Sequence, residues 1–223
     1  MDVGFFLRDR IAFVRQFYDG ASLPFFEKKR KIKAREDPFV PPYSEDGEPP
    51  FIDEWMEADE SLQVLGYACI SMLAAALHLY LKTWKAELGV PVGDSFKSDC
   101  KNGWLNGYKA YFAAHFDIYF DNGPANLSML EEIVLARNRI QHPDNVVSPK
   151  TSYSSHDLAK LPRAFFVDET ERGLFSDVEE SERLWLFPPS VHVTKEKLMA
   201  AIAEVEEFSG WLETQITLRV YSQ

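Results

Sequence analysis

The feature that most limits how this chain can fold is an unbroken helical pattern over residues 57–88. Apolar residues recur there every three to four positions, which places them on one wide face of an α-helix. Such a helix is about 48 Å long, so other helices must pack along it to cover the apolar face. Ala74, Ala75 and Ala76 would let one of them approach closely, and Gly89 is a stop signal. The pattern therefore predicts a mainly α-helical protein.

Five further stretches show helical periodicity and complete a predicted up-down bundle. They are residues 4–18, which Asp19-Gly20 should close, then 22–35, 104–120, 126–143 and 195–219, which Thr194 should cap. A turn at residues 121–124 joins the helices over 104–120 and 126–143, so these two should pair antiparallel.

The first helical stretch, residues 4–18, carries two apolar faces. One face holds Phe6, Arg10, Phe13 and Phe17, and the other holds Leu7, Ile11, Val14 and Tyr18. The spacing leaves open which of them faces the core.

Three segments do not follow the helical pattern. Residues 36–52 are rich in proline and acids and should pack as an extended strap, and residues 90–103 and 144–160 should form a turn-rich connection and a loop. Residues 163–168 and 184–193 are β-prone, so we predict a small β-hairpin before the C-terminal helix. The whole chain, 1–223, should form a single domain, with N-terminal helices and strap over 1–55 and the loop and hairpin inserted over 144–193.

Composition limits the possible environments of the chain. No run of about 18 apolar residues is evident and the N-terminus lacks a signal peptide, so we expect a cytoplasmic protein that spans no membrane. Cys69 should be a core thiol and Cys100 a second free thiol, and no cluster has zinc-ligand spacing, so we expect no metal and no cofactor. The net charge of −11 argues against a general nucleic-acid binder but allows a small charged cleft.

The most distinctive chemistry lies on the helix over residues 126–143. Asn126 or Ser128 can cap its start, and Pro143 should end it by pushing His142 out of the α region. An apolar stripe runs along it, and the expected polar side holds Ser128, Glu131, Glu132 and Arg139. Arg137 falls inside the apolar stripe, which consists of Met129, Leu130, Ile133, Val134, Ala136 and Ile140.

A guanidinium inside an apolar stripe costs several kcal/mol if it is buried without a partner. Arg137 therefore either reaches out to solvent, or meets a carboxylate, or faces a second surface where an anion binds. Asn138 and His142 are helix neighbours at i,i+4, so the amide could fix the tautomer of the imidazole. The alternative is that both residues are structural, since an arginine is often an ion-pair partner and a histidine suits a helix C-terminus.

The stretch Arg137-Asn138-Arg139-Ile140-Gln141-His142 resembles the Arg-polar-x-x-x-His signature of HEPN domains. These are small all-α domains, many of them metal-independent ribonucleases in toxin–antitoxin, anti-phage and CRISPR systems. The resemblance covers these six residues directly, and the helix pattern over about residues 55–223 more loosely. It implies a HEPN-like bundle and a homodimer whose two motifs face one another across a cleft, with Arg137 and His142 catalytic and Asn138 orienting them.

Two functions follow. The first is an endoribonuclease in which the 2′-hydroxyl of RNA is the nucleophile, His142 transfers protons and Arg137 stabilises the phosphorane. The resemblance then implies a toxin or defence protein with an antitoxin or regulatory partner. The second is a non-catalytic helical module that binds a nucleotide or another protein, which the acidic composition favours.

Basic residues outside the motif are candidate RNA contacts. The densest group is Lys28, Lys29, Arg30 and Lys31, and we add Arg139 from the motif helix. A solvated helix face is the simpler interpretation of the first group. Among the other histidines, His78 should be a core or interface residue, and His156 and His192 should be incidental residues of loops and strand ends.

Overall fold

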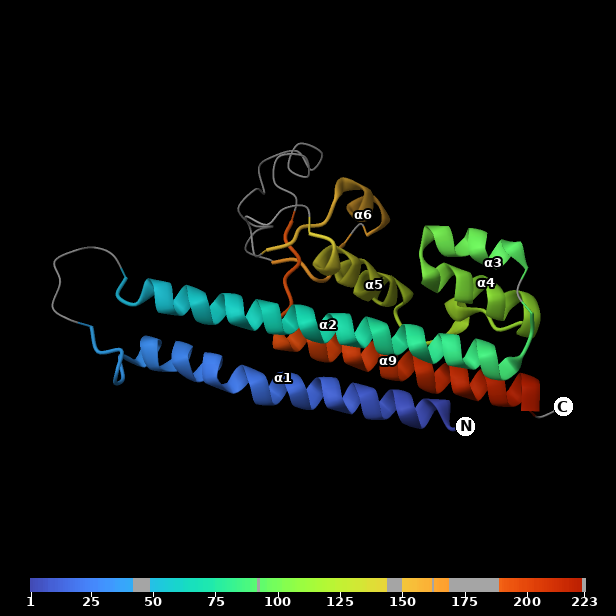
Figure 1. Cartoon of the computed structure of the whole chain (residues 1–223), viewed down its shortest axis with the longest axis horizontal. Coiled ribbons are helices and arrows are strands. Elements are labelled where there is room, and N and C mark those ends of the chain that lie inside the picture. The colour runs from blue at the N-terminus through green and yellow to red at the C-terminus, as the bar shows by residue number, and fades with distance from the viewer. Residues whose placement is uncertain (42–48, 92, 144–149, 162, 169–188, 222–223) are drawn as a thin grey trace.

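The computed structural model describes residues 1–41, 49–91, 93–143, 150–161, 163–168 and 189–221. Long helices α1 (Val3–Ala34), α2 (Ile52–Leu88) and α9 (Lys195–Ile216) run alongside one another, and each packs against the other two (Figure 1). Shorter helices lie along one side of α2. These are α3 (Asp94–Asp99), α4 (Trp104–Phe116), α5 (Leu127–Gln141) and α6 (Ser155–Lys160). The predicted mainly α-helical class is confirmed.

Helix α1 is one continuous helix of 32 residues, so the prediction of two helices that break at Gly20 is wrong. It runs through both Gly20 and Pro24, although each weakens a helix interior. Packing explains the difference, because the face with Leu7, Ile11, Val14 and Tyr18 is buried against the rest of the bundle. The helix ends at Arg35, which has a left-handed φ of 55°.

The core lies between the long helices, α4 and α5. Its largest fully buried side chains include Tyr18, Phe112, Phe120 and Phe208. The Tyr80 hydroxyl, on α2, donates a hydrogen bond to the Ser209 carbonyl of α9 at 3.1 Å. Cys69 is fully buried, as predicted, and burial raises the pKa of its thiol to about 12.

Several helix boundaries differ from the predicted ones. Helix α2 begins at Ile52, within the predicted strap, and α4 ends at Phe116 because Asp117 takes a left-handed φ of 56°. Short turns follow as η1 (Cys100–Asn102) and η2 (Phe120–Asn122), and a π turn, η3 (Thr217–Tyr221), extends α9. The predicted connection over 90–103 contains helix α3. In the strap, the rings of Phe39 and Phe51 pack edge to face at 5.3 Å.

The predicted β-hairpin appears in the described residues only as two isolated antiparallel bridges, Ser152 with Ser190 and Val167 with Val191. The amide of His192 also donates to the Phe166 carbonyl at 2.9 Å. Residues 184–188 of the predicted second strand lie outside the described residues. The predicted loop over 144–160 contains helix α6, which a capping box between Ser154 and Asp157 begins.

Helix α2 is also long and apolar enough to cross a membrane by length and composition, which the expectation of no such segment overlooked. Its most apolar window is 61% buried inside the protein, as in the core helix of a bundle. The apolar character of α2 is therefore used largely in packing against the other helices.

Candidate functional site

Helix α5 begins and ends where the sequence predicts. The side chain of Asn126 caps it by accepting a hydrogen bond from the Met129 amide at 3.2 Å. The Asn126 amide in turn donates to Glu204 of α9 at 2.7 Å, which fixes the start of α5 on the long helices. At the other end His142 has φ −129° and ψ 66°, outside the α region, as expected before Pro143.

Glu132 does not lie on a polar surface, so its predicted position is wrong. Its side chain is buried, with 2% exposure, and accepts hydrogen bonds from the amides of Phe165 and Phe166, both at 2.7 Å. The hydroxyl of Tyr153 donates to it at 3.1 Å. Burial raises the pKa of Glu132, and these hydrogen bonds reduce the increase. Glu132 thus ties the segment after α6 to helix α5.

Arg139 is likewise a structural residue in this fold. Its Nε donates to the Asp157 carboxylate at 2.5 Å and its Nη2 to the Ser154 hydroxyl at 2.7 Å. Burial pushes the pKa of Asp157 up, but the hydrogen bonds from Arg139 and Ser154 outweigh it and hold the pKa below its usual value. The guanidinium therefore holds the start of α6, and the sequence predicted instead a candidate RNA contact.

Arg137 has a different environment. Its side chain is half-buried, and its Nη1 donates to Oδ1 of the neighbouring Asn138 at 2.9 Å. Among the residues that the structure describes, no carboxylate lies within ion-pair distance of it. Of the three predicted alternatives, a neutralising carboxylate is thus not seen in the described part of the chain.

The predicted contact between the Asn138 amide and the His142 ring is not the one observed. The Asn138 side chain holds Arg137, and only the backbone carbonyl of Asn138 accepts from the His142 amide, at 3.1 Å. The His142 side chain is exposed at the end of α5. The motif therefore places a supported guanidinium and an exposed imidazole on the same terminal turn and a half of one helix.

His78, on α2, adds to this region, although the sequence predicts only a core or interface role for it. Its ring stacks on Trp104 of α4 with 4.6 Å between centroids, yet the residue is exposed. Partial burial lowers the pKa of His78, and the positive charges of Lys82 and Arg137 lower it further. Lys82, like Arg137, has no carboxylate partner among the described residues. We call Arg137, His142 and His78 the cation cluster.

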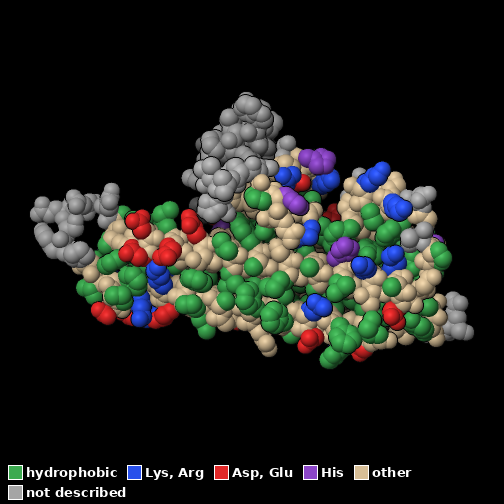
Figure 2. All heavy atoms as spheres, in the orientation of Figure 1, with side chains coloured by type: hydrophobic (Ala, Val, Ile, Leu, Met, Phe, Trp, Pro, Cys, Tyr) green, Lys and Arg blue, Asp and Glu red, His purple; other side chains and the backbone are tan. Residues whose placement is uncertain are grey.

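The surface view agrees with this arrangement. Figure 2 shows Lys, Arg and His side chains gathered over the side of the molecule where α3, α4, α5 and α6 lie, whereas acidic side chains gather toward the end that carries the strap. A chain with a net charge of −11 thus carries a local region of positive charge beside α5.

The basic group at the end of α1 is arranged differently. Lys28 pairs with Glu57 at 2.5 Å, Lys29 pairs with Asp59 at 2.5 Å, and Arg30 is bidentate to both Glu27 and Glu36. Lys31 lies in the same last turns of α1. These four cations stand at the end of the molecule near the strap, away from α5 (Figure 1), and acidic partners largely neutralise the charges of Lys28, Lys29 and Arg30. The simpler interpretation, a solvated helix face, agrees with this pairing.

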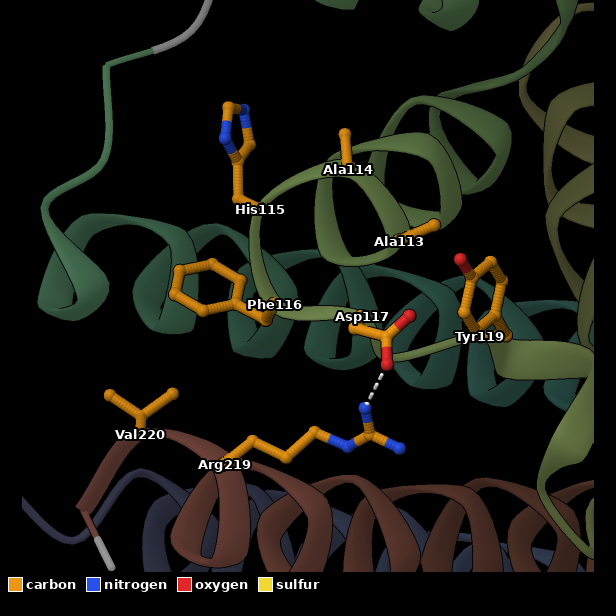
Figure 3. Close-up of a pocket in the computed structure, with 8 residues that line it drawn as sticks. All are labelled: Ala113, Ala114, His115, Phe116, Asp117, Tyr119, Arg219 and Val220. Atoms are coloured by element: carbon orange, nitrogen blue, oxygen red, sulfur yellow. Dashed lines mark hydrogen bonds and ion pairs between the residues drawn. The ribbon is translucent and has the colours of Figure 1, made fainter. Parts of the chain in front are cut away.

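A separate recess of about 850 Å³ lies where the end of α4 meets the end of α9 (Figure 3). Arg219 and Asp117 point toward one another across it, and their atoms Nη1 and Oδ2 are 2.6 Å apart. His115 points away from this ion pair. Neither Arg137 nor His142 lines the recess, so it does not belong to the cation cluster.

Among the described residues, the contacts of the remaining histidines do not involve the cation cluster. His156 is exposed on α6, and His192 is half-buried with its Nδ1 3.8 Å from Asp168. In the part of the chain that the structure describes, no group of three or more His, Cys, Asp and Glu side chains could hold a metal ion.

Comparison with known proteins adds no relative: no family model, no curated protein and no solved structure matches this chain.

Proposed function

We propose that the cation cluster binds a phosphate of RNA and that the protein is a metal-independent endoribonuclease that works as a homodimer. One observation carries this proposal: the half-buried guanidinium of Arg137 is held by an amide and by no described carboxylate. A guanidinium with free N–H donors, whose charge reaches the imidazole of His78 and which shares the end of α5 with His142, is suited to an oxyanion. The resemblance of residues 137–142 to the HEPN signature, and the mainly helical fold, support the same function.

The chemistry needs no group beyond the protein and RNA. The 2′-hydroxyl attacks the adjacent phosphorus, its proton passes to a base, and the 5′-oxygen leaves with a proton from an acid. Exposed His142 is suited to proton transfer, and Arg137 can bind two phosphate oxygens as charge builds on the phosphorane. The products are a 2′,3′-cyclic phosphate and a 5′-hydroxyl.

A dimer supplies two histidines for the two proton transfers. One histidine at one site serves either as base or as acid, whereas a two-fold axis brings a second copy of His142 to the same cleft. A HEPN-like bundle with such a cleft, a cytoplasmic toxin or defence role and an antitoxin or regulatory partner are parts of the proposal that rest on the resemblance alone.

A second function is a non-catalytic module that binds a nucleotide or a protein partner through the same cluster. It is favoured by the ion pairs of Lys28, Lys29 and Arg30, which leave little free positive charge to hold a long RNA backbone. It is also favoured by the use of Asn138 to hold Arg137, since the His142 ring then lacks the orienting amide that the motif predicts.

Purified protein incubated with mixed RNA in EDTA distinguishes the two functions. The ribonuclease should give fragments with cyclic phosphate ends, and both Arg137→Ala and His142→Ala should abolish them. Arg219→Ala is the matched control, because it removes an exposed arginine that belongs to the other recess. Absence of cleavage by the wild type, together with nucleotide binding that Arg137→Ala removes, would favour the second function.

A further inference from the structure

The outward face of α2 is apolar and exposed, although α2 is the central helix of the bundle. Val64 is 57% exposed and Leu79 42% exposed, and Ala68 and Ala75 between them are exposed as well. Ser71 stands at the centre of this row and is half-exposed. Figure 2 shows hydrophobic side chains gathered over the middle of α2 and along α1 on this face.

The order of residues along this row reads nearly the same in both directions. Val64 and Leu79 stand at equal distances from a point between Ser71 and Met72, and so do Ala68 and Ala75. Glu60 lies one turn beyond Val64, and Lys82 lies one turn beyond Leu79, so the two ends carry opposite charges. Both are exposed, and neither has an ion-pair partner among the described residues.

Exposed phenylalanines of α1 lie beside this row. The ion pairs Lys29–Asp59 and Met1–Glu87 set the antiparallel register of α1 and α2, since the residue numbers in each pair add to 88. That register places Phe17 at the level of Ser71 and Phe13 at the level of Ala75 along the two helices. The Phe13 and Phe17 rings stack on one another and are 59% and 40% exposed.

The exposed apolar area fits the centre of a protein interface. Phe6, Phe13 and Phe17 with Val64 and Leu79 expose about 400 Å² if a whole phenylalanine side chain offers about 200 Å². A stable interface buries about 800 Å² on each partner, with an apolar centre and a polar rim. The patch supplies such a centre, and the charged ends of the α2 row supply part of the rim.

We propose that this face binds a second copy of the same chain, with the two α2 helices antiparallel across a two-fold axis near Ser71. The axis would set Ala68 against Ala75 of the second copy, and Val64 against its Leu79. The small residues would let the helices approach closely. Glu60 would meet Lys82 of the second copy twice, once on each side of the axis. A row with this internal symmetry is complementary to a second copy of itself, and this is why we choose the same chain as the partner.

This interface also gives the proposed ribonuclease its cleft, and in this respect alone it rests on the proposed function. Helix α5 lies beside the middle of α2, close to the proposed axis (Figure 1). A two-fold axis perpendicular to α2 and lying in the interface keeps both α5 helices on the same side of the α2 pair. The two copies of Arg137 would therefore line one cleft.

Exchange of the end charges tests the interface by sedimentation at low salt. Glu60→Lys and Lys82→Glu should each weaken the dimer about 10-fold or more, because each replaces two attractive pairs with two repulsive ones. The double variant Glu60→Lys/Lys82→Glu should restore the affinity to within about 3-fold of the wild type, since symmetry restores both attractive pairs. Glu207→Lys, an exposed change of the same charge on α9, should leave the dimer unchanged.

A cysteine at the axis gives a second readout that does not depend on charge. In a Cys100→Ser background Ser71→Cys should form a covalent dimer on mild oxidation, whereas Ala86→Cys, far along the same helix, should not. Cys69 is fully buried and stays out of the reaction. A monomeric wild type would overturn the interface. So would a dimer whose affinity the charge exchange does not change and which Ser71→Cys does not cross-link. A cross-linked dimer that cleaves no RNA would refute the ribonuclease and leave the interface intact.

Discussion

The guanidinium of Arg137 donates to the side-chain oxygen of Asn138, its neighbour in the sequence, across 2.9 Å. Two residues further along the same helix, Arg139 pairs with Asp157 and Ser154. The two arginines thus differ in role. Arg139 holds the start of α6 to α5, while no carboxylate among the described residues neutralises the charge of Arg137. This difference is the basis of the functional proposal.

The two arginines should differ in their effect on stability. Arg139→Ala leaves the largely buried Asp157 without its cation and should lower the free energy of unfolding by about 3 kcal/mol. Arg137→Ala breaks one hydrogen bond to an adjacent residue and should lower it by about 0.5 kcal/mol. Urea denaturation of the two variants measures both values. Equal losses would contradict the assignment of one structural and one functional arginine.

Glu132 should give the protein a pH-dependent stability of known sign. Its folded pKa is raised above the usual 4.5, so folding favours the protonated form. Its contribution is therefore greatest below about pH 4.5 and is lost as the pH rises through the raised folded pKa. The stability of wild type relative to Glu132→Gln, measured by urea denaturation across this range, should fall as the pH rises.

Glu132→Gln should also cost about 1–3 kcal/mol, because its amide group would face the backbone N–H donors of Phe165 or Phe166. Glu131→Gln is the control, since Glu131 is half-exposed and should change neither the stability nor its pH dependence. A wild-type pH profile that Glu132→Gln leaves unaltered would contradict the buried, ionisable role of Glu132.

Alanine substitutions at two helical glycines should change the stability of the protein in opposite directions. A Cβ at Gly20 meets nothing within 4 Å, so Gly20→Ala should stabilise α1 by about 0.5–1 kcal/mol. A Cβ at Gly66 would lie 2.8 Å from the Val193 carbonyl oxygen, so Gly66→Ala should destabilise by about 1–3 kcal/mol. Thermal unfolding measures both. A loss of stability in Gly20→Ala would contradict a continuous helix at that point.

Helix periodicity was enough to predict the class of the fold, and it failed where packing opposes local preference. Gly20 and Pro24 indicate a break in α1, but the buried row from Leu7 to Tyr18 holds the helix against its neighbours. The two apolar faces of α1 could not be ranked from spacing alone. The structure leaves the phenylalanine face exposed, and this face then becomes part of the proposed dimer interface.

The candidate site shows a similar division. Arg137 and His142 could be found because their residue types and spacing carry chemistry within one helix. His78 could not, since it reaches the region from α2, where it stacks on Trp104 of α4 and feels the charge of Arg137 on α5. The partners of Arg139 and Glu132 lie 15 to 34 residues away in the sequence, in a segment whose folding back onto α5 no local pattern predicts.

The most direct test of the anion site is the affinity for a short RNA in which 2′-O-methyl groups prevent cleavage, measured by fluorescence anisotropy in EDTA. Loss of charge-assisted hydrogen bonds at Arg137 should weaken binding of Arg137→Ala about 10-fold or more, because such bonds contribute about 1.5–3 kcal/mol. Arg219→Ala should bind as the wild type does. Equal affinity of the wild type and Arg137→Ala would contradict the account that Arg137 holds the phosphate.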